Sequence, residues 1–121
     1  MAVILIVEDD VFMRNIVEMM VGDLGHNTLP AGDLGEALLL LHSSQHIDAL
    51  ITDIRLKTAV LGGFELAHQA VKIRLKLRVL YMTGNSMTDA MSAMFVEGAH
   101  FLQKPYTESQ LQHSVEKLLA A

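Results

Sequence analysis

Short apolar runs alternate along the chain with longer segments in which apolar residues recur every three or four positions. The run Val3–Val7 is continuously aliphatic, which is typical of a strand buried on both faces of a sheet. The run Thr28–Ala31 is weaker and contains Pro30, which suits an edge strand. The expected strands are Val3–Val7, Thr28–Ala31, Asp48–Thr52, Val79–Met82 and Ala99–Leu102.

The segments that follow these runs predict amphipathic helices, because their apolar residues lie on one face at helical spacing. Asp33 can cap the second helix, and Gly62 and Gly63 precede the third. The first helix is expected between Met13 and Leu24, with a stop at Gly25. The second begins after Asp33, the third after Gly63, the fourth ends at about Glu97, and the fifth carries the apolar stripe from Leu111 to Leu119.

This alternation of strand and helix predicts an α/β fold with a doubly wound, mostly parallel sheet covered by helices on both faces. The length of 121 residues fits a single domain. In an open parallel sheet the ligand site lies beyond the carboxyl ends of the strands. Strand-end residues are therefore the first place to search for chemistry.

Composition excludes several classes of protein. A hydrophobic content of 51% is too high for a disordered chain, and the absence of cysteine removes disulfides and thiolate chemistry. The net charge is −5 with no basic cluster, so we expect no direct DNA binding. No apolar run is long enough to insert into a membrane, and Glu8 follows the first run directly, so that run is no signal peptide. We therefore expect a cytoplasmic protein.

Polar residues follow the predicted strands at the points where these strands end. Glu8 and Asp9 follow the first strand, Asp53 the third, Thr83 the fourth and Lys104 the fifth. Clustered carboxylates repel one another unless a cation neutralises them, and oxygen ligands without histidine favour Mg²⁺. An amine and a hydroxyl beside such a site indicate phosphate chemistry.

Four motifs in order carry a resemblance to a known family. They are Ile4–Asp10 (ILIVEDD), Thr52-Asp53, Met82-Thr83-Gly84 and Lys104-Pro105-Tyr106. Together they resemble the receiver domain of bacterial two-component response regulators, over essentially the whole chain. The resemblance implies a flavodoxin-like five-stranded sheet of order 2-1-3-4-5 and a phosphoacceptor at Asp53. Asp53 would accept a phosphoryl group from a phosphohistidine donor, which is a sensor histidine kinase or a histidine phosphotransfer protein.

The resemblance also implies a Mg²⁺ site and a phosphoryl-binding site. Asp9 resembles the direct metal ligand and Glu8 the ligand acting through water, with Asp53 and the backbone carbonyl of Arg55 completing the set. Thr83 and Lys104 would bind phosphoryl oxygens. Asp10 is then a third, less critical acid, and Arg14 matches the family's arginine six residues after Glu8.

Switching and lifetime residues follow from the same resemblance. Thr83 and an aromatic residue on the fifth strand form the family's switch, and counting back from Lys104 places this aromatic at Phe101. Arg55 and Asn85 stand at the positions that flank the path of the hydrolytic water. Lys104-Pro105 resembles the family's cis junction.

The sequence departs from the family pattern in two places. Leu56-Lys57 replaces the usual pair ending in proline, and the loop to Gly63 is longer than the common form. The stretch from Gly98 to Lys104 is one residue shorter than usual. The loop beside the acceptor and the position of the switch aromatic are the features that these departures affect.

The last predicted helix reaches the end of the chain, so we expect one receiver domain over residues 1–121, with no output domain and a separate downstream protein target. The family's partner face comprises the fourth helix, the fifth strand and the fifth helix. In the fourth helix, Met87, Met91 and Met94 lie at helical spacing with Phe95 beside them, and they either bind a partner or pack on the sheet.

Three functions therefore stay open, in order of preference. The first is a phosphorylation-dependent regulator that passes its signal through the partner face, or passes the phosphoryl group on as a phosphorelay intermediate. The second is a receiver-fold adaptor that binds without phosphorylation. The third is a Mg²⁺-dependent phosphatase or nuclease, which ranks last because no general base is readable beside Asp53. We expect no enzymatic turnover apart from phosphoryl transfer to Asp53 and its hydrolysis.

Overall fold

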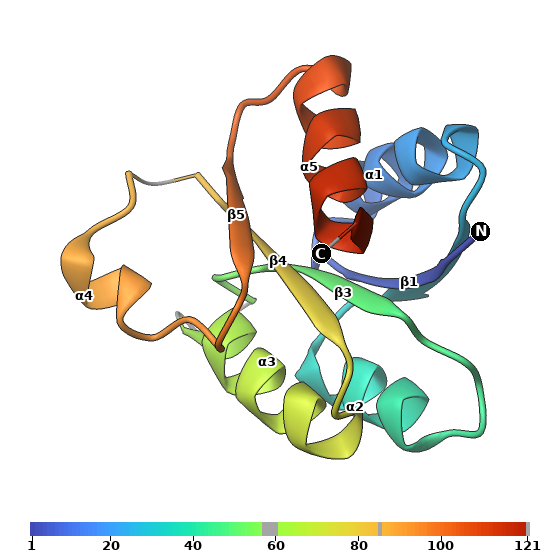
Figure 1. Cartoon of the computed structure of the whole chain (residues 1–121), viewed down its shortest axis with the longest axis horizontal. Coiled ribbons are helices and arrows are strands. Elements are labelled where there is room, and N and C mark those ends of the chain that lie inside the picture. The colour runs from blue at the N-terminus through green and yellow to red at the C-terminus, as the bar shows by residue number, and fades with distance from the viewer. Residues whose placement is uncertain (57–60, 85, 121) are drawn as a thin grey trace.

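The computed structural model describes residues 1–56, 61–84 and 86–120. Its ten elements alternate strictly between strand and helix along the chain (Figure 1). The strands are β1 (Val3–Val7), β2 (Asn27–Ala31), β3 (Ala49–Asp53), β4 (Arg78–Thr83) and β5 (His100–Gln103). The helices are α1 (Val11–Asp23), α2 (Leu34–His42), α3 (Gly62–Ile73), α4 (Asp89–Ser92) and α5 (Glu108–Ala120).

All strand pairs are parallel, and the sheet has the order β2-β1-β3-β4-β5. This confirms the expected fold class, strand order and edge position of the strand that contains Pro30. Helices α1 and α5 lie on one face of the sheet, and α2 and α3 lie on the other (Figure 1). Within the described residues, no helix is both long and apolar enough to span a membrane.

Each face of the sheet buries its own apolar core, because neighbouring residues of a strand point to opposite faces. In β1, for example, Ile4 and Ile6 pack with α1 and α5, whereas Leu5 and Val7 pack with α2 and α3. Burial on both sides explains why the central strands read as continuous apolar runs. This double core holds the carboxyl ends of the strands in fixed positions.

The fourth helix is much shorter than the expected segment reaching Glu97, since α4 ends at Ser92. Beyond it, the amides of Met94 and Phe95 bond to carbonyls three residues earlier, as in turns. The next amide, that of Val96, donates to the Tyr81 hydroxyl at 3.2 Å. The regular helical ladder therefore gives way to turns after Ser92, and Val96 is where a backbone amide of this segment is taken by a distant side chain.

Candidate phosphoacceptor site

The carboxyl ends of four strands place the predicted polar residues at one edge of the sheet. Glu8 follows β1, Asp53 ends β3, Thr83 ends β4 and Lys104 follows β5. The backbone joins these ends directly, since the Lys104 amide donates to the Thr83 carbonyl at 2.8 Å. The sheet thus brings together groups that are up to 96 residues apart in sequence.

Three carboxylates form the acidic part of this site. Glu8 and Asp53 are almost fully buried, with 3% and 6% of their surface exposed, and Asp9 is half-buried. One oxygen from each residue lies within 4.8 Å of the others, close enough to hold one metal ion. The three residues expected as metal ligands through their side chains therefore do converge.

Lys104 supplies positive charge to the same cluster. Its Nζ lies 2.8 Å from Asp53 Oδ1 and 3.1 Å from Glu8 Oε2, so the ammonium bridges two buried carboxylates. Lys104 follows β5, which is separated from the Asp53 strand β3 by β4, and only a quarter of its side chain is exposed. Lys104 is thus a largely buried partner of Asp53 rather than a surface lysine.

The charges and the burial of the cluster shift the pKa values of its members in different directions. Burial raises the pKa of Asp53 from 3.8 to about 8, and the hydrogen bond with Glu8 adds to the shift. Burial would also raise the pKa of Glu8, but bonds from Asp53, Asp10 and Lys104 outweigh it and lower that pKa. The carboxylates in turn raise the pKa of Lys104, although burial opposes this. Asp53 therefore holds its proton more tightly than an ordinary carboxyl group does, and a further cation would lower its pKa.

Backbone contacts hold the acidic loop after β1 in place. The Asp10 carboxylate caps α1 by accepting from the Met13 amide at 3.1 Å, and the Asp10 amide donates to Glu8 Oε1 at 3.1 Å. Arg14 Nη1 donates to the Glu8 carbonyl at 2.9 Å. Asp10 thus caps the start of the helix, and Arg14 holds the backbone of Glu8.

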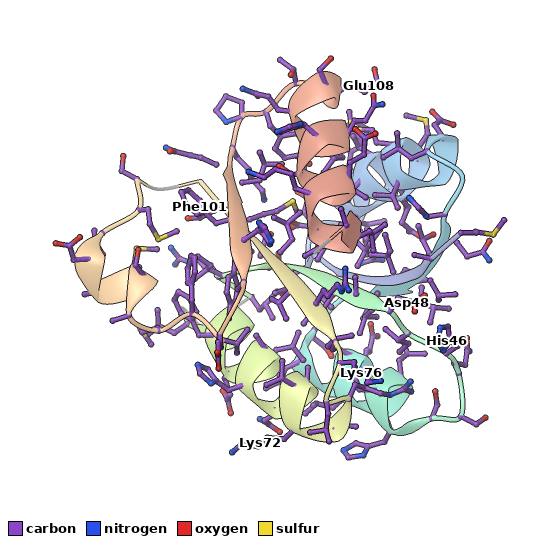
Figure 2. The ribbon with its side chains drawn as sticks, in the orientation of Figure 1. His46, Asp48, Lys72, Lys76, Phe101 and Glu108 are labelled. Atoms are coloured by element: carbon purple, nitrogen blue, oxygen red, sulfur yellow. The ribbon has the colours of Figure 1, made fainter. Side chains whose placement is uncertain are left out.

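The remaining predicted residues lie outside the acidic cluster. Arg55 is exposed in the loop after β3, and Asn85 lies outside the described residues, as does Lys57. Phe101, labelled on β5 in Figure 2, is 45% exposed and its ring lies against Phe95. The Lys104-Pro105 bond is cis, as the resemblance implies.

The apolar residues around α4 differ from an open partner stripe. Met87, Met91, Met94 and Phe95 are only partly exposed and pack against the core on the α2 and α3 face. Of the two alternatives for these residues, packing on the sheet is therefore the one that the structure favours. Their buried sides contribute to the core, so any partner contact would involve the portions that stay exposed.

Comparison with known proteins identifies the family. The family model of the response regulator receiver domain matches residues 4–116. The chain belongs to this family. The receiver is 36% identical to the chemotaxis protein CheY of Pseudomonas aeruginosa, over 95% of this chain and 94% of CheY. It is 26% identical to the sensor kinase/phosphatase LuxN of Vibrio campbellii, over 91% of this chain but 13% of LuxN.

A solved structure supports the same assignment. The crystal structure of a response regulator receiver protein from Sinorhizobium medicae is 27% identical to this receiver, with a TM-score of 0.89. The match covers 99% of this chain and 95% of that one. The fold and the strand order therefore follow those of two-component receiver domains.

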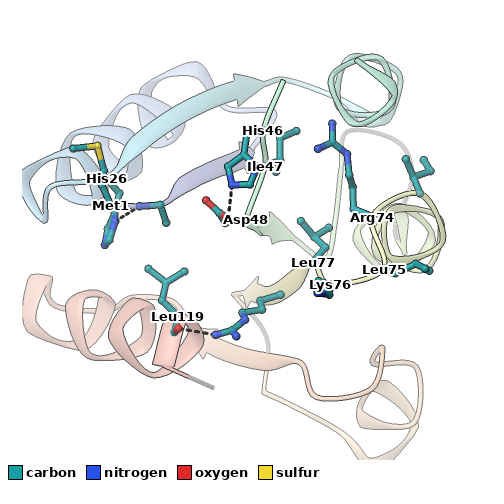
Figure 3. A pocket seen from close by; sticks show the side chains of 13 residues that line it. Met1, His26, His46, Ile47, Asp48, Arg74, Leu75, Lys76, Leu77 and Leu119 are labelled. Atoms are coloured by element: carbon teal, nitrogen blue, oxygen red, sulfur yellow. Dashed lines mark hydrogen bonds and ion pairs between the residues drawn. The ribbon is translucent and has the colours of Figure 1, made fainter. Parts of the chain in front are cut away.

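A larger groove, of about 870 Å³, lies at the opposite end of the receiver's sheet (Figure 3). Several of its polar side chains are paired within the protein. His46 Nε2 lies 2.7 Å from Asp48 Oδ1, and Arg78 Nη1 donates to the Leu119 carbonyl at 2.6 Å. This groove contains none of the clustered strand-end residues Glu8, Asp9, Asp53, Thr83 and Lys104, so the acidic edge is the candidate site.

Sequence reasoning did not recognise that Gly63 matters to the receiver site. A Cβ at this position would overlap the Asp53 carbonyl oxygen and come within 2.7 Å of Ile54 Cα. The Gly63 amide also donates to the Ile54 carbonyl at 2.7 Å. A signal was present, since glycine is a poor helix former and its presence at a helix start indicates close backbone approach.

Proposed function

We propose that this receiver accepts a phosphoryl group on Asp53 from a phosphohistidine protein and thereby switches the binding of a downstream target. The observation that carries the proposal is the position of Asp53. It is a buried carboxylate at a strand end, with an ammonium at 2.8 Å and two further carboxylates beside it. Such a group combines a nucleophile with the charges that a phosphoryl group requires.

The transfer makes and breaks one bond at phosphorus. A carboxylate oxygen of Asp53 bonds to phosphorus while the phosphorus–nitrogen bond of the donor histidine breaks. The bonding electron pair returns to the imidazole, which takes up a proton from solvent. Asp53 has to be ionised to attack, so the cation that lowers its raised pKa is part of the proposal.

The donor set fits Mg²⁺, because it comprises carboxylates and contains no histidine or cysteine. Asp9, Asp53 and the Arg55 carbonyl would hold the ion directly, and Glu8 through water. When bound, the ion would neutralise charge on the phosphoryl oxygens and on the acceptor. Lys104 already lies at Asp53 and would bind another phosphoryl oxygen, and the hydroxyl of buried Thr83 would bind a third.

The donor has to cover the edge of the sheet where Asp53 lies. Beside Lys104, an apolar groove of about 440 Å³ runs between α1 and the loop after β5, and Met13, Ile16 and Tyr106 contribute to its lining. Phe12, which precedes Met13 on α1, is 71% exposed. An apolar surface of this kind suits a protein donor better than a small charged one. We therefore propose that the histidine kinase or phosphotransfer protein binds here.

The proposed switch comprises Thr83 and Phe101. Thr83 ends β4, where it would move toward a phosphoryl group on Asp53, and Phe101 lies on the neighbouring strand β5. Occupation of the site thus shifts an equilibrium between two arrangements of the face formed by α4, β5 and α5. A phosphorelay intermediate would use the same acceptor, whereas an adaptor that binds without phosphorylation would leave Asp53 unused.

Intact mass after treatment with acetyl phosphate, with and without Mg²⁺, tests the proposal. Wild type is expected to gain one phosphoryl group in Mg²⁺, and Asp53→Asn none, because the amide is not a competent nucleophile. Asp23→Asn, an identical change at an exposed residue near the end of α1, serves as the matched control and should label like wild type. Equal labelling of Asp53→Asn and wild type would refute the assignment.

A further inference from the structure

Four aromatic rings form a continuous chain from the core to the surface of the partner face. The Phe64 ring on α3 lies 5.2 Å from that of Tyr81 on β4, and Tyr81 lies 4.6 Å from Phe95. Phe95 lies 6.0 Å from both Phe64 and Phe101. Centroid distances in this range indicate ring packing. Phe95 therefore contacts buried rings on one side and the half-exposed Phe101 on the other.

The sheet register connects this aromatic chain to the acceptor site. Tyr81 pairs with Phe101 across β4 and β5, and Thr83 pairs with Gln103. Residues two apart on a strand point to the same face, and so do register partners in a parallel pair. Thr83, Tyr81 and Phe101 consequently share one face of the sheet, the one on which Phe95 packs.

Two polar contacts tie the segment 93–98 to the rest of the protein. The Val96 amide donates to the buried Tyr81 hydroxyl at 3.2 Å, and His68 Nε2 lies 2.8 Å from the Met94 carbonyl. Phe95 lies between these two anchor points in sequence. The hydroxyl of Tyr81 thus holds the backbone of this segment, while its ring packs on the Phe95 side chain.

We propose that Tyr81 and Phe95 are positioning residues that hold Phe101 in its half-exposed position and set how readily it moves. The inference rests on the proposed switching function and names the contacts through which the switch works in this chain. Close-packed rings cannot move independently, so Phe101 cannot turn toward Thr83 without a shift of Phe95. The hydrogen bond from Val96 to Tyr81 resists that shift because it fixes the adjacent backbone.

The test uses the chain's two tyrosines as a matched pair. Tyr81→Phe removes a hydroxyl that accepts a hydrogen bond, whereas Tyr106→Phe removes a buried hydroxyl without a partner among the described residues. Fluorine-labelled phenylalanine gives four resonances in wild type and five in either Tyr→Phe variant, and single Phe→Leu changes in each background assign them. The exposed Phe12 is an internal reference for the buried and half-exposed rings.

Tyr81→Phe is expected to shift the equilibrium of Phe101 by about fivefold, the size typical of one neutral hydrogen bond. The Phe101 resonance should move toward its position in the acetyl phosphate-treated wild type, and hydrogen exchange of the Val96 amide should accelerate by about the same factor. Phe95→Leu should displace the Phe101 resonance in the same direction. Tyr106→Phe should leave both readouts at their wild-type values.

Two results would overturn the inference. One is an unchanged Phe101 resonance in both Tyr81→Phe and Phe95→Leu. The other is exchange that accelerates equally in all strands, because that shows a general loss of stability rather than a local contact. Intact mass of the same samples reports phosphorylation separately. Wild type that stays unlabelled would refute the proposed function, while the resting-state resonances and exchange rates would still decide the role of Tyr81.

Discussion

Gly63 lies where helix α3 packs directly against the backbone of Asp53 and Ile54, and its substitution tests how tightly the candidate site is built. A Cβ at this position would overlap the Asp53 carbonyl oxygen and lie 2.7 Å from Ile54 Cα and 2.9 Å from the Asp53 carbonyl carbon. Ordinary van der Waals contacts of a Cβ are 3.4–4 Å. The contacted atoms are backbone, which cannot rotate away, so Gly63→Ala has to separate the helix from the strand.

The size of the effect follows from two opposing terms. Overpacking costs about 1–3 kcal/mol, and a clash with backbone belongs at the upper end of about 3 kcal/mol. The better helix propensity of alanine opposes this by raising the free energy of unfolding by about 1 kcal/mol. We therefore expect Gly63→Ala to lower the free energy of unfolding by about 2 kcal/mol. With a slope of about 2 kcal/mol per molar urea, the midpoint falls by about 1 M.

Urea unfolding together with the rate of labelling by acetyl phosphate measures both consequences. Because the displaced atoms belong to Asp53, Gly63→Ala should also take up the phosphoryl group more slowly than wild type. Gly22→Ala is the matched control, since Gly22 lies on α1 and a Cβ there would meet nothing within 4 Å, and this change should stabilise the protein by up to about 1 kcal/mol. A Gly63→Ala protein as stable as Gly22→Ala would refute the reasoning.

The acceptor, a buried tyrosine and the loop arginine provide three more tests. Because burial raises the pKa of Asp53 to about 8, its contribution to wild-type stability is lost as the pH rises from about 4 to about 8. In metal-free buffer, the free energy of unfolding of Asp53→Asn, measured in urea, should therefore rise relative to that of wild type over this pH range. A difference between the two proteins that does not change with pH would contradict the pKa shift. Tyr106→Phe removes a buried hydroxyl that lacks a partner among the described residues, so thermal unfolding should show a free energy of unfolding higher by about 1 kcal/mol. A lower free energy of unfolding would show that the hydroxyl has a hydrogen-bond partner. Arg55→Ala should lose its phosphoryl group several-fold faster in a mass time course, since one shielding contact is worth about 1 kcal/mol. An unchanged rate would show that exposed Arg55 does not cover the acceptor.

The strands and the acidic cluster could be predicted from the sequence because their causes are local. A continuous aliphatic run such as Val3–Val7 identifies a strand buried on both faces, and its polar successor Glu8 then lies at the edge of the sheet. Asp53 and Lys104 follow from the same rule. The spacing of motifs along the chain carries this information without any knowledge of tertiary contacts.

The extent of α4 could not be predicted in this way, because the segment after it turns and makes a contact with a distant strand. Helical spacing of Met87, Met91 and Met94 continues past Ser92, whereas the helix ends there. The amide of Val96 is taken by a hydroxyl that lies 15 residues earlier in the chain. Periodicity cannot reveal that partner, and it equally conceals the overlap that makes Gly63 necessary.

The same features explain why a response to phosphorylation would emerge at β5 rather than elsewhere in the sheet. Strand β5 lies at an edge and is hydrogen-bonded within the sheet to β4 alone, and its residues alternate between half-buried and exposed. The segment before it contains a helix of four residues with none buried. Central strands such as β3 are buried throughout, so moving them would disturb both cores at once. A displacement at Thr83 therefore meets least resistance toward Phe101, where the Tyr81 hydroxyl and the Phe95 ring are the contacts that oppose it.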